Sequence, residues 1–72
     1  MKIQSARITP MPRSMFDPMP QIFATTYDGQ EHFMFEYYPD ELSFTPAEFK
    51  GLTVAEARAL KVKKDRDYLT SN

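Results

Sequence analysis

The chain has 72 residues, of which 42% are apolar and 26% charged, and its formal net charge is −1. This length allows one small domain, residues 1–72, and leaves no room for a catalytic domain beside a binding domain. The chain contains no cysteine, which excludes disulfides, thiolate zinc sites, iron–sulfur clusters and cysteine nucleophiles. Its longest apolar runs, such as Phe33–Phe35, have three residues, far below the ~18 residues of a membrane-spanning helix, so we expect a soluble, cytoplasmic protein.

Charge is distributed unevenly along the chain. Residues 1–16 carry three basic residues and no acid, whereas residues 17–49 carry seven acids and no lysine or arginine. Residues 50–72 carry six basic residues and three acids. Charge blocks of this kind influence the choice of partner more than they influence the fold.

The first 20 residues predict a strand followed by a connector. Residues 1–9 are half polar and include β-branched side chains, which favours a short edge strand that Pro10 ends. Residues 10–20 contain four prolines and three methionines, which is typical of an extended segment. We expect this connector to lie over the sheet. A proline-rich ligand for an SH3- or WW-type groove is the alternative.

Residues 21–38 predict a β-hairpin, because two β-rich runs flank Asp28-Gly29. A two-residue loop pairs Ile22 with Phe35, and also gives the pairs Phe23–Met34, Ala24–Phe33, Thr25–His32 and Gln21–Glu36. The predicted core face then carries Ile22, Ala24, Phe33, Phe35 and Tyr37. The opposite face carries three apolar side chains that either self-associate or are covered by the connector: Phe23, Met34 and Tyr38. A three-residue loop with a bulge at Gly29 stays open as an alternative that would shift this register.

Two helix starts follow the hairpin. Thr45 and Thr53 each precede a glutamate by three residues, which is the capping-box pattern, and Pro46 suits a first helical turn. We therefore predict a short helix over 45–51 and a C-terminal helix over 53–69. On the second helix one side carries Ala55, Ala59, Val62 and Leu69, and beside it lie Val54, Ala57, Leu60 and Tyr68.

These elements predict an α+β fold. A small antiparallel sheet of about three strands, with the Asp-Gly hairpin at its centre, is packed by the C-terminal helix on the face of Ile22, Phe33 and Phe35.

No motif in the sequence indicates catalysis, a metal site or a cofactor. His32 is the only histidine, and no serine stands in a recognisable nucleophile context. On a strand Glu31 projects away from His32 and Glu36, so these residues alone do not form a metal site. We expect a protein that is not an enzyme.

The C-terminal helix supplies a basic cluster that could bind nucleic acid. Asp65 and Asp67 interleave with it, which weakens this alternative. The residues are Arg58, Lys61, Lys63, Lys64 and Arg66. A further alternative is an oligomer that binds a small ligand such as a nucleotide between subunits.

Two resemblances accompany these patterns. Residues 49–57, F-K-G-L-T-V-A-E-A, are similar to a helix start of PASTA domains, but there the helix precedes the strands, so no ligand of that family is carried over. The whole chain, with E-Y-Y-P-D-E at 36–41 and the ending from Lys64 to Leu69, resembles small accessory proteins of phages and mobile elements. This resemblance implies an inhibitor or modifier of a host machine, including anti-defence proteins.

The acidic block predicts a surface for a partner protein. Acids interleaved with tyrosines would suit a basic cleft of a host protein, for example one that binds nucleic acid, with charge steering the encounter and tyrosines contributing binding energy. The alternative is that residues 61–66 and the N-terminal basic residues neutralise these acids internally. The residues of the predicted surface are Asp28, Glu31, Glu36, Tyr37, Tyr38, Asp40 and Glu41.

Overall fold

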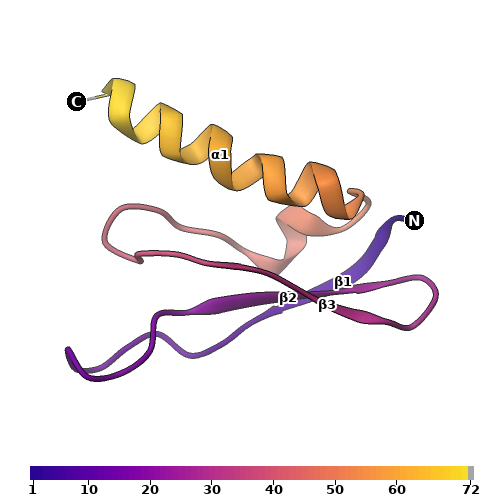
Figure 1. Ribbon diagram of the computed structural model, residues 1–72, viewed down its shortest axis with the longest axis horizontal. Coiled ribbons are helices and arrows are strands. Elements are labelled where there is room, and N and C mark those ends of the chain that lie inside the picture. The colour runs from indigo at the N-terminus through magenta and orange to yellow at the C-terminus, as the bar shows by residue number, and fades with distance from the viewer. Residues whose placement is uncertain (72) are drawn as a thin grey trace.

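The computed structural model describes residues 1–71, which form a three-stranded antiparallel sheet, a short 3₁₀ helix and one α-helix. Strands β1 (Ile3–Ile8), β2 (Gln21–Thr26) and β3 (Glu31–Glu36) lie in the order β1-β2-β3, so β2 is central. The helices η1 (Pro46–Phe49) and α1 (Val54–Ser71) follow. Segment 37–52 lies between α1 and the sheet (Figure 1). The predicted α+β fold is confirmed.

The β2–β3 hairpin closes with a three-residue loop, 27–29, and not with the predicted two-residue loop. The Thr26 N–H donates to Gln30 O (3.0 Å), and the Gly29 N–H donates to Thr26 O (2.9 Å). Gly29 has a φ of 85°, a left-handed conformation that glycine adopts without steric cost. The Asp28 carboxylate holds the loop, since it accepts hydrogen bonds from the Gln30 N–H and from the Thr26 hydroxyl.

The longer loop shifts the register near the turn by one residue, and a β-bulge at Met34 shifts it back. Ile22 faces Phe35 as predicted, but Phe23 faces Phe33 in place of Met34. The outer pair Gln21–Glu36 is also confirmed. The predicted pairs that the shift breaks are Phe23–Met34, Ala24–Phe33 and Thr25–His32.

The bulge also exchanges two side chains between the faces of the sheet. Met34 is 5% exposed and belongs to the core, whereas Phe33 is 47% exposed. Phe33 lies edge-on to Phe23 on the outer face, with 5.6 Å between ring centroids. The prediction that Phe33 belongs to the core is therefore wrong, because a one-residue shift moves a side chain to the opposite face. Phe23, Met34 and Tyr38 do not share one face as predicted.

Segment 37–49 supplies the aromatic part of the core. The Phe44 ring lies 4.9 Å from the Tyr37 ring, 5.1 Å from Phe35 and 5.9 Å from Phe49, measured between centroids. These contacts cover the inner face of the sheet, which alone has too little apolar surface to form a core. Among the residues that the structure describes, the buried cluster comprises Ile3, Ile22, Ala24, Met34, Tyr37, Leu42, Phe44, Phe49 and Ala57.

The start of α1 is anchored beside β1. The Ile3 N–H donates to Leu52 O (2.7 Å), and the Gly51 N–H donates to Ile3 O (2.9 Å). The predicted capping box at the helix start is present, because the Thr53 N–H donates to Glu56 (2.9 Å) and the Glu56 N–H donates to the Thr53 hydroxyl (3.1 Å). The helix therefore begins at Val54, in agreement with the sequence pattern.

The buried side of α1 is the predicted side that carries Val54, Ala57 and Leu60. Ala57 is fully buried, and Val54 and Leu60 pack against the core. The main contact of α1 with the sheet is to β3, where the Arg58 guanidinium donates to Phe33 O (3.2 Å). The helix therefore packs on the core that contains Ile22, with Phe35 beside it, as predicted, and segment 37–52 contributes to the same core. Phe33 is not part of this face. The outward stripe is Ala55, Ala59, Val62 and Leu69.

The proline-rich connector does not lie over the sheet. Met15 and Phe16 are each 89% exposed, and residues 10–20 form a loop at one end of the molecule (Figure 1). Only its final part is held by the core, where Pro20 is buried and Pro20 O accepts a hydrogen bond from the Tyr37 N–H (3.3 Å). The outer face of the sheet therefore has no cover from this segment.

The observed register predicts unequal effects of two phenylalanine truncations. Phe49→Ala should lower the free energy of unfolding by about 3–5 kcal/mol, because Phe49 is fully buried. Phe33→Ala should lower it by roughly 1 kcal/mol, because this side chain loses only a partly exposed ring contact. Urea unfolding of both variants measures the difference. Equal, large losses would place Phe33 in the core and contradict the bulged register.

Candidate functional site

The acids and tyrosines predicted to bind a partner do not form one surface. Asp28 and Glu31 lie at the hairpin turn, whereas Glu36, Asp40 and Glu41 lie at the opposite end of β3 (Figure 1). A strand of this length spans about 20 Å. The predicted site is therefore divided between two ends of the molecule.

Glu31 is neutralised within the chain. Arg7 on β1 donates two hydrogen bonds to its carboxylate, from Nε (2.9 Å) and from Nη2 (3.0 Å). The hydrogen bond from Arg7 lowers the pKa of Glu31 and raises the pKa of Arg7. The same guanidinium lies 4.2 Å from the centroid of the Phe23 ring. Glu31 is thus part of an internal contact on the outer face of the sheet.

Glu48 is neutralised by α1. Lys64 Nζ donates to Glu48 Oε1 (2.6 Å) and to Ser43 O (2.7 Å), and it lies 4.2 Å from the centroid of the Phe44 ring. Desolvation raises the pKa of Glu48, but the hydrogen bonds from Lys64 and from the Thr45 N–H outweigh it, so the net shift is downward. Lys64 therefore connects the helix to segment 43–48.

Tyr37 is not available to a partner. It is 1% exposed, and its hydroxyl accepts or donates no hydrogen bond within the part of the chain that the structure describes. Burial raises its pKa, and the nearby Glu48 carboxylate raises it further. Its prediction as a partner-binding residue is wrong, because alternate side chains of this segment point inward and outward, and Tyr37 points inward.

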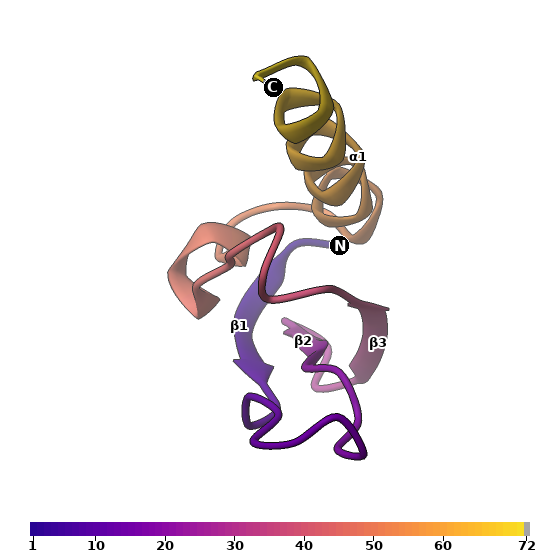
Figure 2. The same ribbon diagram turned by 90° about the vertical axis from the view of Figure 1, so that its left-hand side faces the viewer.

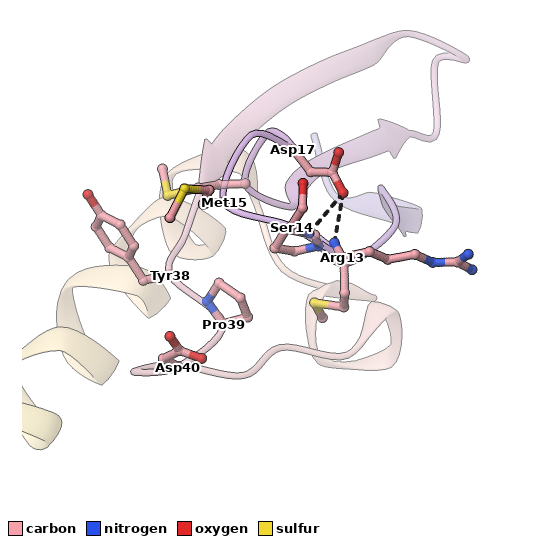
Figure 3. Close-up of a pocket in the computed structure, with 10 residues that line it drawn as sticks. Arg13, Ser14, Met15, Asp17, Tyr38, Pro39 and Asp40 are labelled. Atoms are coloured by element: carbon pink, nitrogen blue, oxygen red, sulfur yellow. Dashed lines mark hydrogen bonds between the residues drawn. The ribbon is translucent and has the colours of Figure 1, made fainter.

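Tyr38, Asp40 and Glu41 lie beside the proline-rich loop. Residues 38–40 and residues 11–15, 17 and 19 line an open pocket of about 580 Å³ between them. Figure 3 shows Tyr38 and Asp40 to the left, Met15 beside Tyr38, and Arg13, Ser14 and Asp17 to the right. Figure 2 shows this end of the molecule facing the viewer, with the loop below the sheet and α1 above it. We call residues 11–17 and 38–41 the loop end.

Asp17 orders the proline-rich side of the loop end. Its Oδ2 accepts hydrogen bonds from the Arg13 N–H (2.8 Å) and the Ser14 N–H (3.2 Å), and its own N–H donates to Ser14 O (3.2 Å). These bonds close a small turn that presents Met15 and Phe16 at its tip. The turn therefore has a defined shape although its side chains are in solvent.

The loop end gathers exposed apolar groups beside acids. Met15 and Phe16 are 89% exposed and Tyr38 is 62% exposed. Asp40 and Glu41 form no ion pair within residues 1–71, unlike Glu31 and Glu48. The sequence indicated Tyr38, Asp40 and Glu41 as site residues. It did not indicate residues 11–17, because their methionines and prolines suggested a segment that packs over the sheet. The S-x-x-D spacing of Ser14 and Asp17 was the signal for a local turn.

The basic cluster of α1 is mostly engaged with the chain itself. Arg58 bonds to Phe33 O, Lys64 bonds to Glu48, and Lys61 pairs with Asp65 within the helix (2.9 Å). Within residues 1–71 only Lys63 and Arg66 of the five predicted residues lack such a contact. Two free cations offer few phosphate contacts, which disfavours the nucleic-acid alternative.

The only histidine of the sequence, His32, lies on β3 close to the hairpin turn. His32 Nε2 lies 3.2 Å from the hydroxyl of Thr26, which is 2% exposed and bonded to Asp28, so this hydroxyl is closed to a substrate. No three acidic or histidine side chains converge among residues 1–71 as a metal site requires. Neither helix in this range combines the length and apolar character needed to cross a bilayer.

The buried hydroxyl of Tyr37 allows a direct test of its structural role. Tyr37→Phe should leave the free energy of unfolding unchanged or raise it by about 1–2 kcal/mol, because it removes a buried polar atom that has no partner. Thermal and urea unfolding measure this change, and Tyr38→Phe is the exposed control, expected to have no effect. A loss above 1 kcal/mol for Tyr37→Phe would show that the hydroxyl is hydrogen-bonded in solution.

Comparison with known proteins adds no relative. No protein-family model, no curated protein and no solved structure matches the chain.

Proposed function

We propose that this chain is a non-catalytic protein-interaction module that binds a basic surface of a partner protein through the loop end. The observation that carries the proposal is the combination of highly exposed apolar side chains with two acids, Asp40 and Glu41, that form no ion pair among residues 1–71. Contiguous exposed apolar groups mark interaction surfaces, since monomeric proteins keep few of them.

The apolar groups of the loop end suit the centre of an interface. Tyr38 has an aromatic ring with a polar tip, a type of side chain that often dominates binding energy. The turn that Asp17 closes fixes the backbone around Met15 and Phe16, so less conformational entropy is lost on binding than for a flexible loop. Methionine adapts its shape to the opposing surface.

The acids of the loop end suit the rim of the same interface. The loop end contains three acids, Asp17, Asp40 and Glu41, and one basic residue, Arg13. Such a surface attracts a basic partner over several ångströms and repels acidic ones. The acids nearer the hairpin turn contribute less, because Arg7 neutralises Glu31 and the turn itself uses Asp28.

The most specific form of the proposal is an inhibitor or modifier of a host protein in the cytoplasm. Its support is the resemblance to phage-type accessory proteins and the ability of carboxylates to occupy places where a basic groove binds phosphates. In this form the protein blocks the groove in a stoichiometric complex and turns over no substrate.

The reversal of two acids tests the proposed surface. Asp40→Lys/Glu41→Lys should abolish capture of the partner from nuclease-treated host lysate, while the melting temperature stays within a few degrees, because both residues are exposed. Lys63→Glu/Arg66→Glu is the matched control and should retain the partner.

Two outcomes would contradict the proposal. Retention of the partner by the acid-reversal variant would move the interface away from the loop end. Loss of binding only in Lys63→Glu/Arg66→Glu, together with sensitivity to nuclease, would favour the nucleic-acid alternative.

A further inference from the structure

The chain uses one recognition pattern twice in its own fold: a cation placed over an aromatic ring and paired with a carboxylate. Arg7 lies over Phe23 and bonds to Glu31, with 4.2 Å from its guanidinium carbon to the ring centroid. In the second case Lys64 Nζ lies 4.2 Å from the Phe44 centroid and bonds to Glu48 (2.6 Å). Cation–π attraction and charge pairing reinforce each other in this arrangement.

The pocket of the loop end contains the same aromatic and acidic components without the cation. Tyr38 and Asp40 line it together, and no basic residue of the described range 1–71 pairs with Asp40. Arg13 also lines the pocket, but Figure 3 shows its guanidinium extending away from Tyr38 and Asp40. We propose that this pocket binds the side chain of an arginine or lysine of the partner protein.

The walls of the pocket fit the aliphatic part of such a side chain. Met11, Met15 and Met19 line it together with the Tyr38 ring. Arginine and lysine pack their methylene groups along apolar surfaces while their charged ends reach polar groups. The volume of about 580 Å³ is sufficient for one long side chain with its hydration water.

The carboxylates select the charge of the occupant. Asp40 is unpaired within residues 1–71, and Asp17 uses Oδ2 for the turn, which leaves Oδ1 as an acceptor. Two carboxylates repel a phosphate, and two are fewer than the three ligating groups that a metal site needs. An organic cation with an apolar stem fits both the apolar walls and the negative charge of the pocket. This inference rests on the proposed function, because it names the group by which the partner is held.

Titration with a matched pair of small probes tests the pocket in the full chain. N-acetyl-arginine methylamide should shift the amide signals of Met15, Asp17, Tyr38 and Asp40 in two-dimensional NMR. N-acetyl-citrulline methylamide, which has nearly the same shape but no charge, should bind about tenfold more weakly. Asp40→Asn should weaken the arginine probe about threefold to fivefold, and Tyr38→Leu should weaken it similarly. Glu41→Gln is the matched control, since Glu41 does not line the pocket, and should bind normally.

Several results would overturn the inference. Equal binding of the two probes, no shift at the pocket residues, or an unchanged affinity in both Asp40→Asn and Tyr38→Leu would each contradict it. Tighter binding of spermidine than of the arginine probe would assign the pocket to a free polyamine. If the arginine probe fails but acid reversal still abolishes partner capture, this inference fails and the proposed function stands. If the probe binds as expected but the acid-reversal variant still captures the partner, the pocket accepts a cationic side chain but the loop end is not the interface, so the proposed function fails and the assignment of the occupant to the partner fails with it.

Discussion

The packing of Tyr37, Phe44 and Phe49 against the sheet is the interaction on which the rest of the structure depends. Three short strands and the first half of a helix do not bury enough apolar surface to hold each other without it. The aromatic rings of segment 37–49 fill that space, and Lys64 fixes the segment from the other side through Glu48 and the Phe44 ring. This packing also creates the candidate site. Because Tyr37 points into the core, its neighbour Tyr38 points outward into the pocket of the loop end.

The acids of residues 17–49 form one block in the sequence, but in the structure they have two different roles. Glu31 and Glu48 pair with Arg7 and Lys64, which supports internal neutralisation for these two acids. Asp40 and Glu41 have no ion pair within residues 1–71, which supports an interface at the loop end. A carboxylate in each internal pair has a lowered pKa, so its contribution to stability is complete above the ordinary glutamate pKa and is lost as the pH falls through the lowered value. The two hypotheses for the acidic block therefore apply to different acids.

The sequence was sufficient for the elements but not for the register or for the packed face of the helix. Strand composition, the Asp-Gly turn and the threonine–glutamate spacing identified the sheet and the helix starts, because these signals are local. Asp28-Gly29 is compatible with both a two-residue and a three-residue loop, and only packing of Met34 in the core distinguishes them. Two neighbouring sides of α1 carry apolar residues, so the helix sequence alone does not show which side is buried. The packing of segment 37–52 decides which of them faces the core. Residues 11–17 joined the site through tertiary contact with residues 38–40, which no local pattern encodes.

The hairpin register determines which side chains of β3 form the core, and cross-strand nuclear Overhauser effects measure it directly. The structure predicts contacts between the ring protons of Phe23 and Phe33, whose centroids are 5.6 Å apart, and slow exchange of amides around the buried Met34. A register without the bulge would instead give contacts of Phe33 with Ala24 and of Phe23 with Met34. Observation of that second set would contradict the bulge and, with it, the placement of Met34 in the core and of Phe33 on the outer face.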